Sequence, residues 1–554
     1  MTKRLAITLT MVLVLALALV ANGFAARNPR EIIIGMAQEP DTLNNMLSDM
    51  SATSQAVGGL TDDLLERDGN WKLFPQMATQ IPTIENGLWK VLPGDKMQVT
   101  WQLKKGLRWR DGREITAEDF EFTWKVIMND DLGVPSREVS EMIEKFEIKD
   151  KYTFVLHFKQ LYHLANLGLD YNPIPKHIFE PIVKSGAKAF AEADFTKVVF
   201  ENGPYMVKEW VRGSHLVTVA NPRYNGTEKA KVQTVIFRFI PNTNTLMANL
   251  LAGAVDMLTP VGLTLDQGLA LDKMIRDQKR GTDYGVQFTT ALTWEHIDFN
   301  LDNPWLKDKR VRQALVYAID RQAMVDALFE GKQFVSHSYL PPKHYGYNPN
   351  VKQYEYSPAK AAELLAAAGW KKGADGIMEN TKGEKMILTI HTTAGNAVRE
   401  KVEMIIKDQW KKIGIELKIE NVASTVLFGE ISPKRAYEHM TMYAWTSPPT
   451  TNPYGLWDSS QIPTAENAYA GQNRPGWRNA KSDELSRAIL KELDEKKRIA
   501  LFHEHQALWS EELPSIPLYF RVDVSATHKN LQNVKPTGNT TPITWNVQNW
   551  SWAN

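Results

Sequence analysis

The stretch "LKKGLRWRDGREITAEDFEFTWK", residues 103–125, contains a clear turn and helix start. Thr116 and Asp119 stand three residues apart, the spacing of a capping box in which a hydroxyl and a carboxylate satisfy free amides at the start of a helix. Apolar side chains then recur at helical spacing, at Phe120, Trp124 and Ile127. The stretch therefore predicts a helix that begins after Thr116.

The acidic residues of this stretch have two interpretations. Asp111, Glu114, Glu118 and Asp119 could form a catalytic carboxylate cluster. Capping and the placement of negative charge in the first helical turn explain them more simply, because both stabilise a helix N-terminus. We therefore interpret these acids as structural.

Strand-like segments flank the helix on both sides. "KMQVTWQ" (residues 96–102) precedes it and "YTFVLHF" (residues 152–158) follows it, which predicts a small α+β unit. Nearer the N-terminus, "EIIIG" (residues 31–35) predicts a short buried strand closed by Gly35. A buried strand at this place favours an α/β sheet, into which the α+β unit is inserted.

Length and charge describe a large protein whose partner is not a polyanion. The 554 residues exceed what one hydrophobic core fills, so two or three domains are expected. Lys and Arg number 65 and Asp and Glu number 64, which gives a formal net charge of +1. This balance argues against a nucleic-acid groove or a polybasic membrane patch.

The N-terminus has the pattern of a secretory signal peptide, residues 1–25. Lys3 and Arg4 precede an apolar run, and small residues allow cleavage after Gly23 or Ala25. The apolar run is slightly short for an uncleaved membrane anchor. Because the chain has no cysteine, it has no lipid-anchor site after the signal. We expect a periplasmic protein.

Three further helical segments are well marked. "DKRVRQALVYAID" (residues 308–320) has an apolar face, and "SPAKAAELLAAAGW" (residues 357–370) has Ser357 as its cap. One long helical region is predicted from Ser482 to about Trp509.

Known catalytic and cofactor motifs are absent from the sequence. It contains no GxxxxGK[ST], GxGxxG, GxSxG or HExxH. His503 and His505 stand two residues apart, where helix side chains do not face each other, so a metal pair is not expected. We predict no catalytic residue, no cofactor and no metal site.

Five segments, in order along the chain, resemble landmarks of one protein family. They are residues 103–125, "ENGPYMVKEW" (201–210), "LLAGAVDM" (250–257), 308–320 and 357–370. The family is the family 5 extracellular solute-binding proteins, the dipeptide- and oligopeptide-binding receptors of ABC importers. Asn202 follows Glu201 where a Gly-Thr pair is usual in the family.

The resemblance implies an α/β fold of two lobes joined by a hinge, the type II, cluster C-like form of the periplasmic binding protein fold, with an additional inserted α+β domain. By analogy, lobe I comprises residues 27–70, 203–290 and 522–554. The inserted domain comprises residues 71–202 and lobe II residues 291–521.

The uncharged stretch "TMYAWTSPPTTNPYGLW", residues 441–457, is the candidate ligand wall. In the family, a tryptophan followed by a turn lines the cleft, and peptide-binding members usually carry an aspartate shortly after it that pairs with the peptide's amino terminus. Here Trp445 is followed by neutral residues as far as Asp458. This departure puts recognition of a charged amino terminus in doubt.

Ten residues are candidates for ligand contact. Flat aromatic faces and uncharged hydrogen-bonding groups suit sugar rings, apolar side chains or a peptide backbone. The candidates are Tyr443, Trp445, Thr446, Asn452, Tyr454, Trp457 and Asn473 on this wall, Asp49 and Ser51 on the near side, and Asn300. Core packing for the aromatic residues, and a surface-loop position for Asp49, Ser51 and Asn300, are the alternatives.

The function that we expect is a monomeric periplasmic receptor that closes two lobes on a peptide or a short oligosaccharide and delivers it to an ABC permease. A secreted glycan-degrading enzyme is the second hypothesis, since aromatic platforms with carboxylates also describe glycosidases. A periplasmic chaperone or chemoreceptor partner is the third.

Overall fold

The computed structural model describes residues 28–553, except 196, 199, 227 and 540. The predicted signal peptide, residues 1–25, lies outside this range. Within the described part, none of the helices is both long and apolar enough to cross a bilayer.

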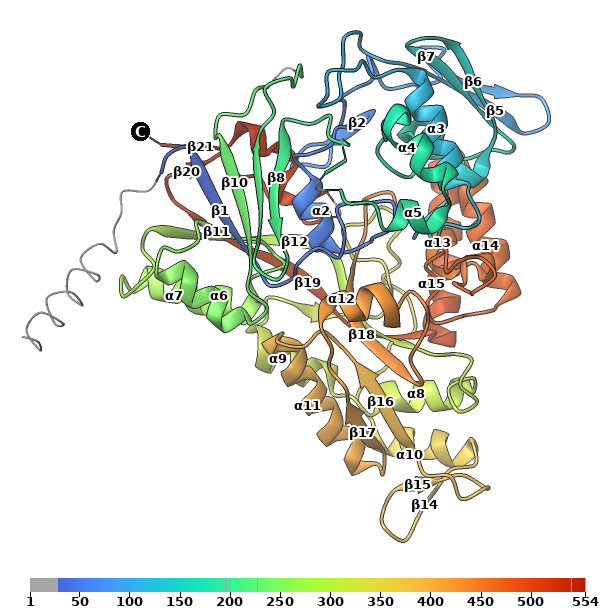
Figure 1. Ribbon diagram of the computed structural model, residues 1–554. Coiled ribbons are helices and arrows are strands. Elements are labelled where there is room, and N and C mark those ends of the chain that lie inside the picture. Colours follow the sequence, from blue (N-terminus) through green and yellow to red (C-terminus); the bar gives the residue numbers. More distant parts are fainter. Residues whose placement is uncertain (1–27, 196, 199, 227, 540, 554) are drawn as a thin grey trace, which may run out of the picture.

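One mixed sheet of eleven strands runs through the molecule (Figure 1). In spatial order its main path is β17 (Glu416–Ile419), β16 (Ile387–His391), β18 (Met440–Thr446), β12 (Tyr284–Phe299), β19 (Ser515–His528), β11 (Met257–Leu258), β1 (Glu31–Met36), β10 (Thr234–Phe239), β9 (His215–Ala220) and β8 (Tyr205–Val211). The short β13 (Phe334–Val335) pairs with β19 outside this path. The predicted N-terminal strand is confirmed as β1, which pairs in parallel with β10.

Helices pack against both halves of the eleven-stranded sheet. In Figure 1, α6 and α7 lie beside the β1 half, and α8 to α11 surround the β16 half. The helices named here are α2 (Ser51–Val57), α6 (Thr243–Leu251), α7 (Leu265–Arg276), α8 (Lys309–Tyr317), α9 (Arg321–Phe329), α10 (Pro358–Ala367), α11 (Ala397–Lys412), α13 (Pro453–Trp457), α14 (Ala480–Lys491) and α15 (Glu495–Glu512). The β1 half and the β16 half of the sheet are the first and second lobes.

The long strands β12 and β19 belong to both lobes. Their antiparallel pairing runs from Tyr284 opposite His528 to Asp298 opposite Ser515. It is irregular in the middle: β12 advances from Thr290 to Trp294 while β19 moves only from Val522 to Phe520. Such an interruption bends a ladder locally. The two lobes are therefore joined by two adjacent strands that bend together at this interruption, and a second register shift follows between Glu295 and His296.

A separate four-stranded antiparallel sheet forms the additional α+β unit. Its strand order is β4 (Trp89–Leu92), β5 (Lys96–Gln102), β7 (Thr153–Phe158) and β6 (Ile143–Asp150). The predicted helix is confirmed as α3 (Ala117–Ile127), and its capping box is present, with the Thr116 amide donating to Asp119 at 2.9 Å. Phe120 of α3 stacks on Phe154 of β7 at 5.2 Å between ring centroids.

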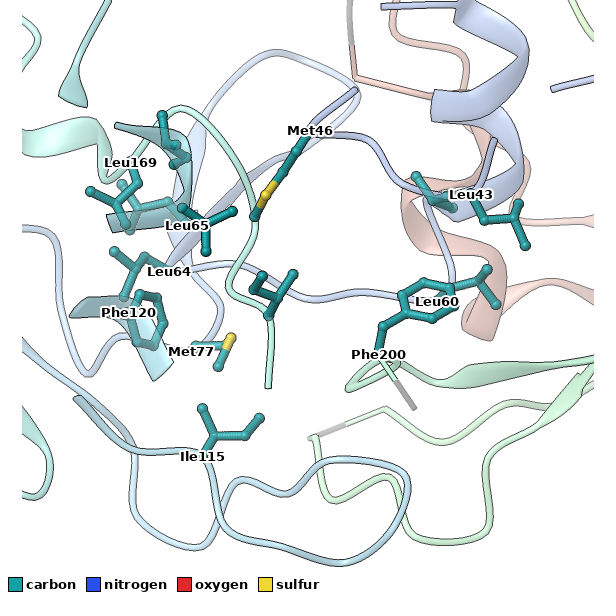
Figure 2. Packing of buried hydrophobic residues seen from close by; sticks show 14 of the residues in the cluster. Leu43, Met46, Leu60, Leu64, Leu65, Met77, Ile115, Phe120, Leu169 and Phe200 are labelled. Carbon is teal, nitrogen blue, oxygen red and sulfur yellow. The ribbon is translucent and has the colours of Figure 1, made fainter. Parts of the chain in front are cut away.

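The additional unit shares its hydrophobic core with the first lobe. One cluster of buried side chains joins Ile32 of β1 to Phe154 of β7. Figure 2 shows part of this cluster, in which Leu64, from the chain before the unit, lies beside Phe120, and Leu60 lies beside Phe200. A common core of this kind predicts that the unit and the first lobe move as one body.

The other predicted helices are found, with one correction. The segments at 308–320 and 357–370 form α8 and α10, and Ser357 accepts a hydrogen bond from the Lys360 amide at 3.2 Å. The expected single helix from Ser482 to Trp509 is wrong. It is two helices, α14 and α15, because Asp494 caps a new helix by accepting from the Lys497 amide at 2.9 Å.

Buried Asp62 predicts a stability that falls as the pH rises. Its carboxylate accepts hydrogen bonds from Gln76 at 2.8 Å and Tyr224 at 3.0 Å, and burial raises its pKa to about 7. The folded state therefore holds this proton up to about pH 7, whereas the unfolded chain releases it near pH 4. The pKa of Asp62 differs by about three units between the folded and the unfolded state, so we expect Asp62→Asn to reduce the loss of unfolding free energy between pH 4 and pH 8 by about 4 kcal/mol.

Urea denaturation across this pH range measures the effect. Asp131→Asn is the control, since Asp131 is exposed and the same change there leaves the pH dependence as it is. Equal pH slopes for the wild type and Asp62→Asn would refute the raised pKa.

Candidate functional site

A cavity of about 580 Å³ lies between the two lobes and is also bordered by the additional unit. The first lobe contributes α2 and the loop before it, the unit contributes residues 135–139 and 162–171, and the second lobe contributes β18 and the loop after it. Arg521 and Asp523 of β19 line the cavity at the strand bend. The first lobe, the additional unit, the second lobe and the strand bend thus all contribute to the cavity wall.

Strand β18 places the aromatic wall. Tyr443 is buried, and its hydroxyl donates to Asp298 at 2.5 Å. Trp445, two residues further on the same face, is half-buried and lines the cavity. The guanidinium of Arg474 lies 5.6 Å from the Tyr443 ring centre and 5.5 Å from that of Trp445. The wall is therefore two aromatic rings with a cation held against both.

An ion pair crosses the cavity between the lobes. Asp49, in the loop before α2, contacts the guanidinium of Arg474 from the second lobe. Burial lowers the pKa of Arg474, but Asp49 and Tyr443 raise it more, so that its pKa lies above the ordinary value. The Arg474 side chain is only 3% exposed. This pair is a direct contact between the two lobes.

Six of the ten predicted ligand residues line the cavity: Asp49, Ser51, Tyr443, Trp445, Thr446 and Asn452. Thr446 shares a hydrogen bond of 2.9 Å with Thr293 across the β12–β18 pairing. Asn452 caps α13 by accepting from the Tyr454 amide at 2.8 Å, and its amide group contacts Glu138 of the additional unit. That these six contact a ligand stays a prediction.

The other four predicted residues are not among those that line the cavity. Trp457 packs against Trp509 and Tyr339, each at 5.5 Å between ring centroids. The Tyr454 hydroxyl donates to Glu141 at 3.1 Å. The Asn473 amide group donates to the carbonyls of Asp458 and Trp477, at 3.0 and 2.8 Å, and Asn300 donates to the Tyr437 carbonyl at 2.7 Å. These side chains are occupied by packing and internal hydrogen bonds.

Charged residues of the wall were missed by the sequence reasoning. Arg399 of α11 donates to the buried Glu295 at 2.7 Å, and Arg521 lies 3.7 Å from the same carboxylate. Burial raises the pKa of Asp523, two residues along β19, although Arg521 opposes this. Glu138 also lines the cavity. No motif marks these residues, since they come from four separate segments.

This wall suits reversible binding of a solute. It combines apolar rings, uncharged donors and acceptors, and both signs of charge, which is typical of a site that orients a ligand. Within the described part of the chain, no three His, Asp or Glu residues are grouped closely enough to hold a metal ion.

Comparison with known proteins gives the family. The model of the bacterial extracellular solute-binding proteins, family 5 Middle, matches residues 73–464. An oligopeptide-binding protein from Thermus thermophilus, solved with a pentapeptide, is 31% identical with a TM-score of 0.86, covering 95% of this chain and 96% of that one.

Two further comparisons concern AppA, the oligopeptide-binding protein of Bacillus subtilis. Its sequence is 27% identical over 513 residues, which is 91% of this chain and 89% of AppA. Its structure with a nonapeptide has a TM-score of 0.83 at 25% identity, covering 95% of this chain and 100% of that one.

The chain belongs to family 5 of the bacterial extracellular solute-binding proteins. The resemblance drawn from the five sequence landmarks is thereby confirmed. The expected two-lobed α/β fold with a hinge and an additional α+β unit is confirmed as well.

Proposed function

We propose that this protein captures a peptide in the cavity between its lobes and delivers it to the permease of an ABC importer. The observation that carries the proposal is the cavity of about 580 Å³, whose wall is shared by both lobes and the strand bend. Its volume falls within the range of roughly 300–1,000 Å³ typical of small-ligand sites. The relatives solved with a pentapeptide and a nonapeptide support a peptide as the ligand.

The proposed mechanism is closure of the lobes about β12 and β19. The moving bodies are residues 27–70, 71–202, 203–290 and 522–554 on one side and residues 291–521 on the other, as the sequence landmarks suggest. The ladder irregularity between Thr290 and Trp294 supports this boundary, because a bulge is a place where a strand pair bends easily. Closure buries the ligand and creates the surface that a permease recognises.

The proposal also covers the location, the oligomeric state and the absence of catalysis. The protein is secreted to the periplasm with cleavage after Gly23 or Ala25, acts as a monomer, and breaks no bond. Membership of a family described as solute-binding supports a receptor rather than the glycan-degrading alternative. The chaperone or chemoreceptor alternative has no specific observation in its favour.

A thermal-shift screen tests the proposal. The mature chain, unfolded and refolded to remove carried ligand, is screened against di- to pentapeptides and β-linked oligosaccharides. A ligand at a thousand times its Kd adds about 4 kcal/mol and moves the midpoint by several degrees. A shift with peptides supports the proposal, a shift with sugars alone makes the site an oligosaccharide platform, and reducing ends released from glucan would favour the enzyme.

Trp445→Ala is expected to weaken peptide binding about tenfold, because it removes a half-buried aromatic face from the cavity wall. Titration calorimetry with the peptide that gives the largest thermal shift measures the change. Tyr356→Ala is the control, as Tyr356 is an aromatic residue of the same lobe that is 40% exposed and lies outside the cavity. Equal affinities for the wild type and Trp445→Ala would show that Trp445 does not contribute to peptide binding.

A further inference from the structure

The carboxylate of Glu138 has one free oxygen in the cavity. Its Oε1 accepts a hydrogen bond from the Tyr162 hydroxyl at 3.1 Å and contacts the amide of Asn452 from the second lobe. Among the described residues, none donates a hydrogen bond to Oε2, and none forms an ion pair with Glu138. One oxygen holds the side chain in place, which leaves the other available to a ligand.

A second acceptor lies beside this oxygen. A Cβ placed on Gly455, which lines the cavity, would lie 3.2 Å from Oε2 of Glu138 and 3.8 Å from the side-chain oxygen of Gln472. Both acceptors therefore lie within 4 Å of the same point. A group that occupied this space would need several donors, which an ammonium has.

The charge around Glu138 is negative. Burial raises the pKa of Glu138 to about 7, and the nearby carboxylates of Asp170 and Glu141 both contribute to this rise. The carboxylate of Asp170 is already used by the backbone and hydroxyl of Ser140, at 2.8 and 2.6 Å. Glu141 accepts from Tyr454 and lies outside the cavity wall. Glu138 is therefore the acid in this group that faces the cavity with a free oxygen.

We propose that Glu138, with Gln472, binds a primary ammonium group of the ligand and selects for ligands that carry one. The inference rests on the proposed function, because it places this selection in the peptide cavity. The sequence has no acid between Trp445 and Asp458, and Glu138 supplies a carboxylate to the same cavity from the additional unit. The ammonium belongs either to a peptide amino terminus or to a lysine side chain.

The test uses three pentapeptides with wild-type protein and Glu138→Gln. They are Ala-Val-Leu-Val-Ala, its N-acetylated form, and the N-acetylated form with lysine in place of the central leucine. Glu138→Gln keeps an acceptor for Tyr162 and Asn452 but loses the charge. We expect it to bind the free peptide about 10- to 100-fold more weakly and the acetylated leucine peptide unchanged.

The pattern of binding identifies the source of the ammonium. If the acetylated lysine peptide also loses affinity in Glu138→Gln, the subsite accepts a side chain; if only the free peptide does, it accepts an amino terminus. Glu144→Gln is the matched control, because Glu144 is exposed on β6 and lies outside the cavity, and it should bind all three peptides as the wild type does. Gly455→Ala, which fills the space between the two acceptors, should weaken binding of the ammonium peptides without removing the carboxylate.

A pH series supplies a readout that a purely structural role of Glu138 would not change. The titratable groups facing Glu138 are Asp170, Glu141 and Tyr162. With a pKa of about 7, Glu138 is mostly neutral at pH 5.5, so wild-type affinity for the free peptide should fall about tenfold from pH 7.5 to pH 5.5. In Glu138→Gln this fall should be absent.

Two results would overturn the inference, and they are distinguishable. Equal weakening of the free and the acetylated leucine peptide, or none at all, refutes the ammonium subsite while leaving peptide capture intact. Failure of the wild type to bind any of the three peptides refutes both the subsite and the peptide function on which it rests.

Discussion

Trp457→Ala is expected to lower the free energy of unfolding by about 3 to 5 kcal/mol, the usual cost of removing a large aromatic side chain from a core. Trp457 is 3% exposed and packs against Trp294, Trp477, Trp509 and Tyr339, with ring centroids 5.5 to 6.4 Å away. Alanine would leave a cavity that these rings cannot close without shifting. Urea denaturation of the ligand-free protein measures the loss.

Trp445→Ala is the comparison for this result. Trp445 stands on the cavity wall and is half-buried, so its removal should cost much less stability and more affinity. If Trp457→Ala lost less than about 1 kcal/mol of stability but most of its peptide affinity, the assignment of Trp457 to the core would be wrong.

Arg474→Met is expected to weaken peptide binding about 100-fold. Methionine keeps an apolar stem against Tyr443 and Trp445 but leaves Asp49 facing the cavity without its cation. Removing one partner of a buried pair costs about 3 to 5 kcal/mol. Separation of the lobes exposes Asp49 to water, so the variant lowers this cost by favouring the open form. A ligand must then spend part of its binding free energy on closing the lobes, which lowers its measured affinity.

Calorimetry gives the affinity, and solution scattering gives the dimensions with and without peptide. Arg478→Met is the control, because Arg478 is 56% exposed and pairs with Asp302 within the same lobe. Asp49→Asn combined with Arg474→Met should recover part of the affinity, since no uncompensated charge remains. Unchanged affinity and dimensions in Arg474→Met would show that the pair does not connect the lobes energetically.

Helix starts could be predicted wherever residues close together in sequence form the capping hydrogen bond. The helix after Thr116 and the helix after Ser357 begin where expected, because their caps are hydrogen bonds between residues three apart in sequence. The break between α14 and α15 was missed although Asp494 provides a similar cap. Apolar residues continue on both sides of it, so periodicity alone suggested one helix.

The neutral stretch at residues 441–457 shows the limit of such reasoning for the site. Its first half, on β18, faces the cavity with Trp445, whereas Trp457, at the end of α13, turns into the core. Both are tryptophans in one uncharged segment, and nothing in their local sequence separates them. The turn at Asn452, which caps α13, redirects the chain between them.

The sequence by itself determined the helix starts, the first strand and the family, because these depend on short-range spacing and on the order of landmarks along the chain. Only the tertiary structure decided which side chains form the site. Asp49 and Arg474 are 425 positions apart, and Glu138 and Asn452 are 314 apart. Their contacts arise because β12 and β19 bring two lobes together, and the charge and burial of a side chain depend on that arrangement rather than on its neighbours in sequence.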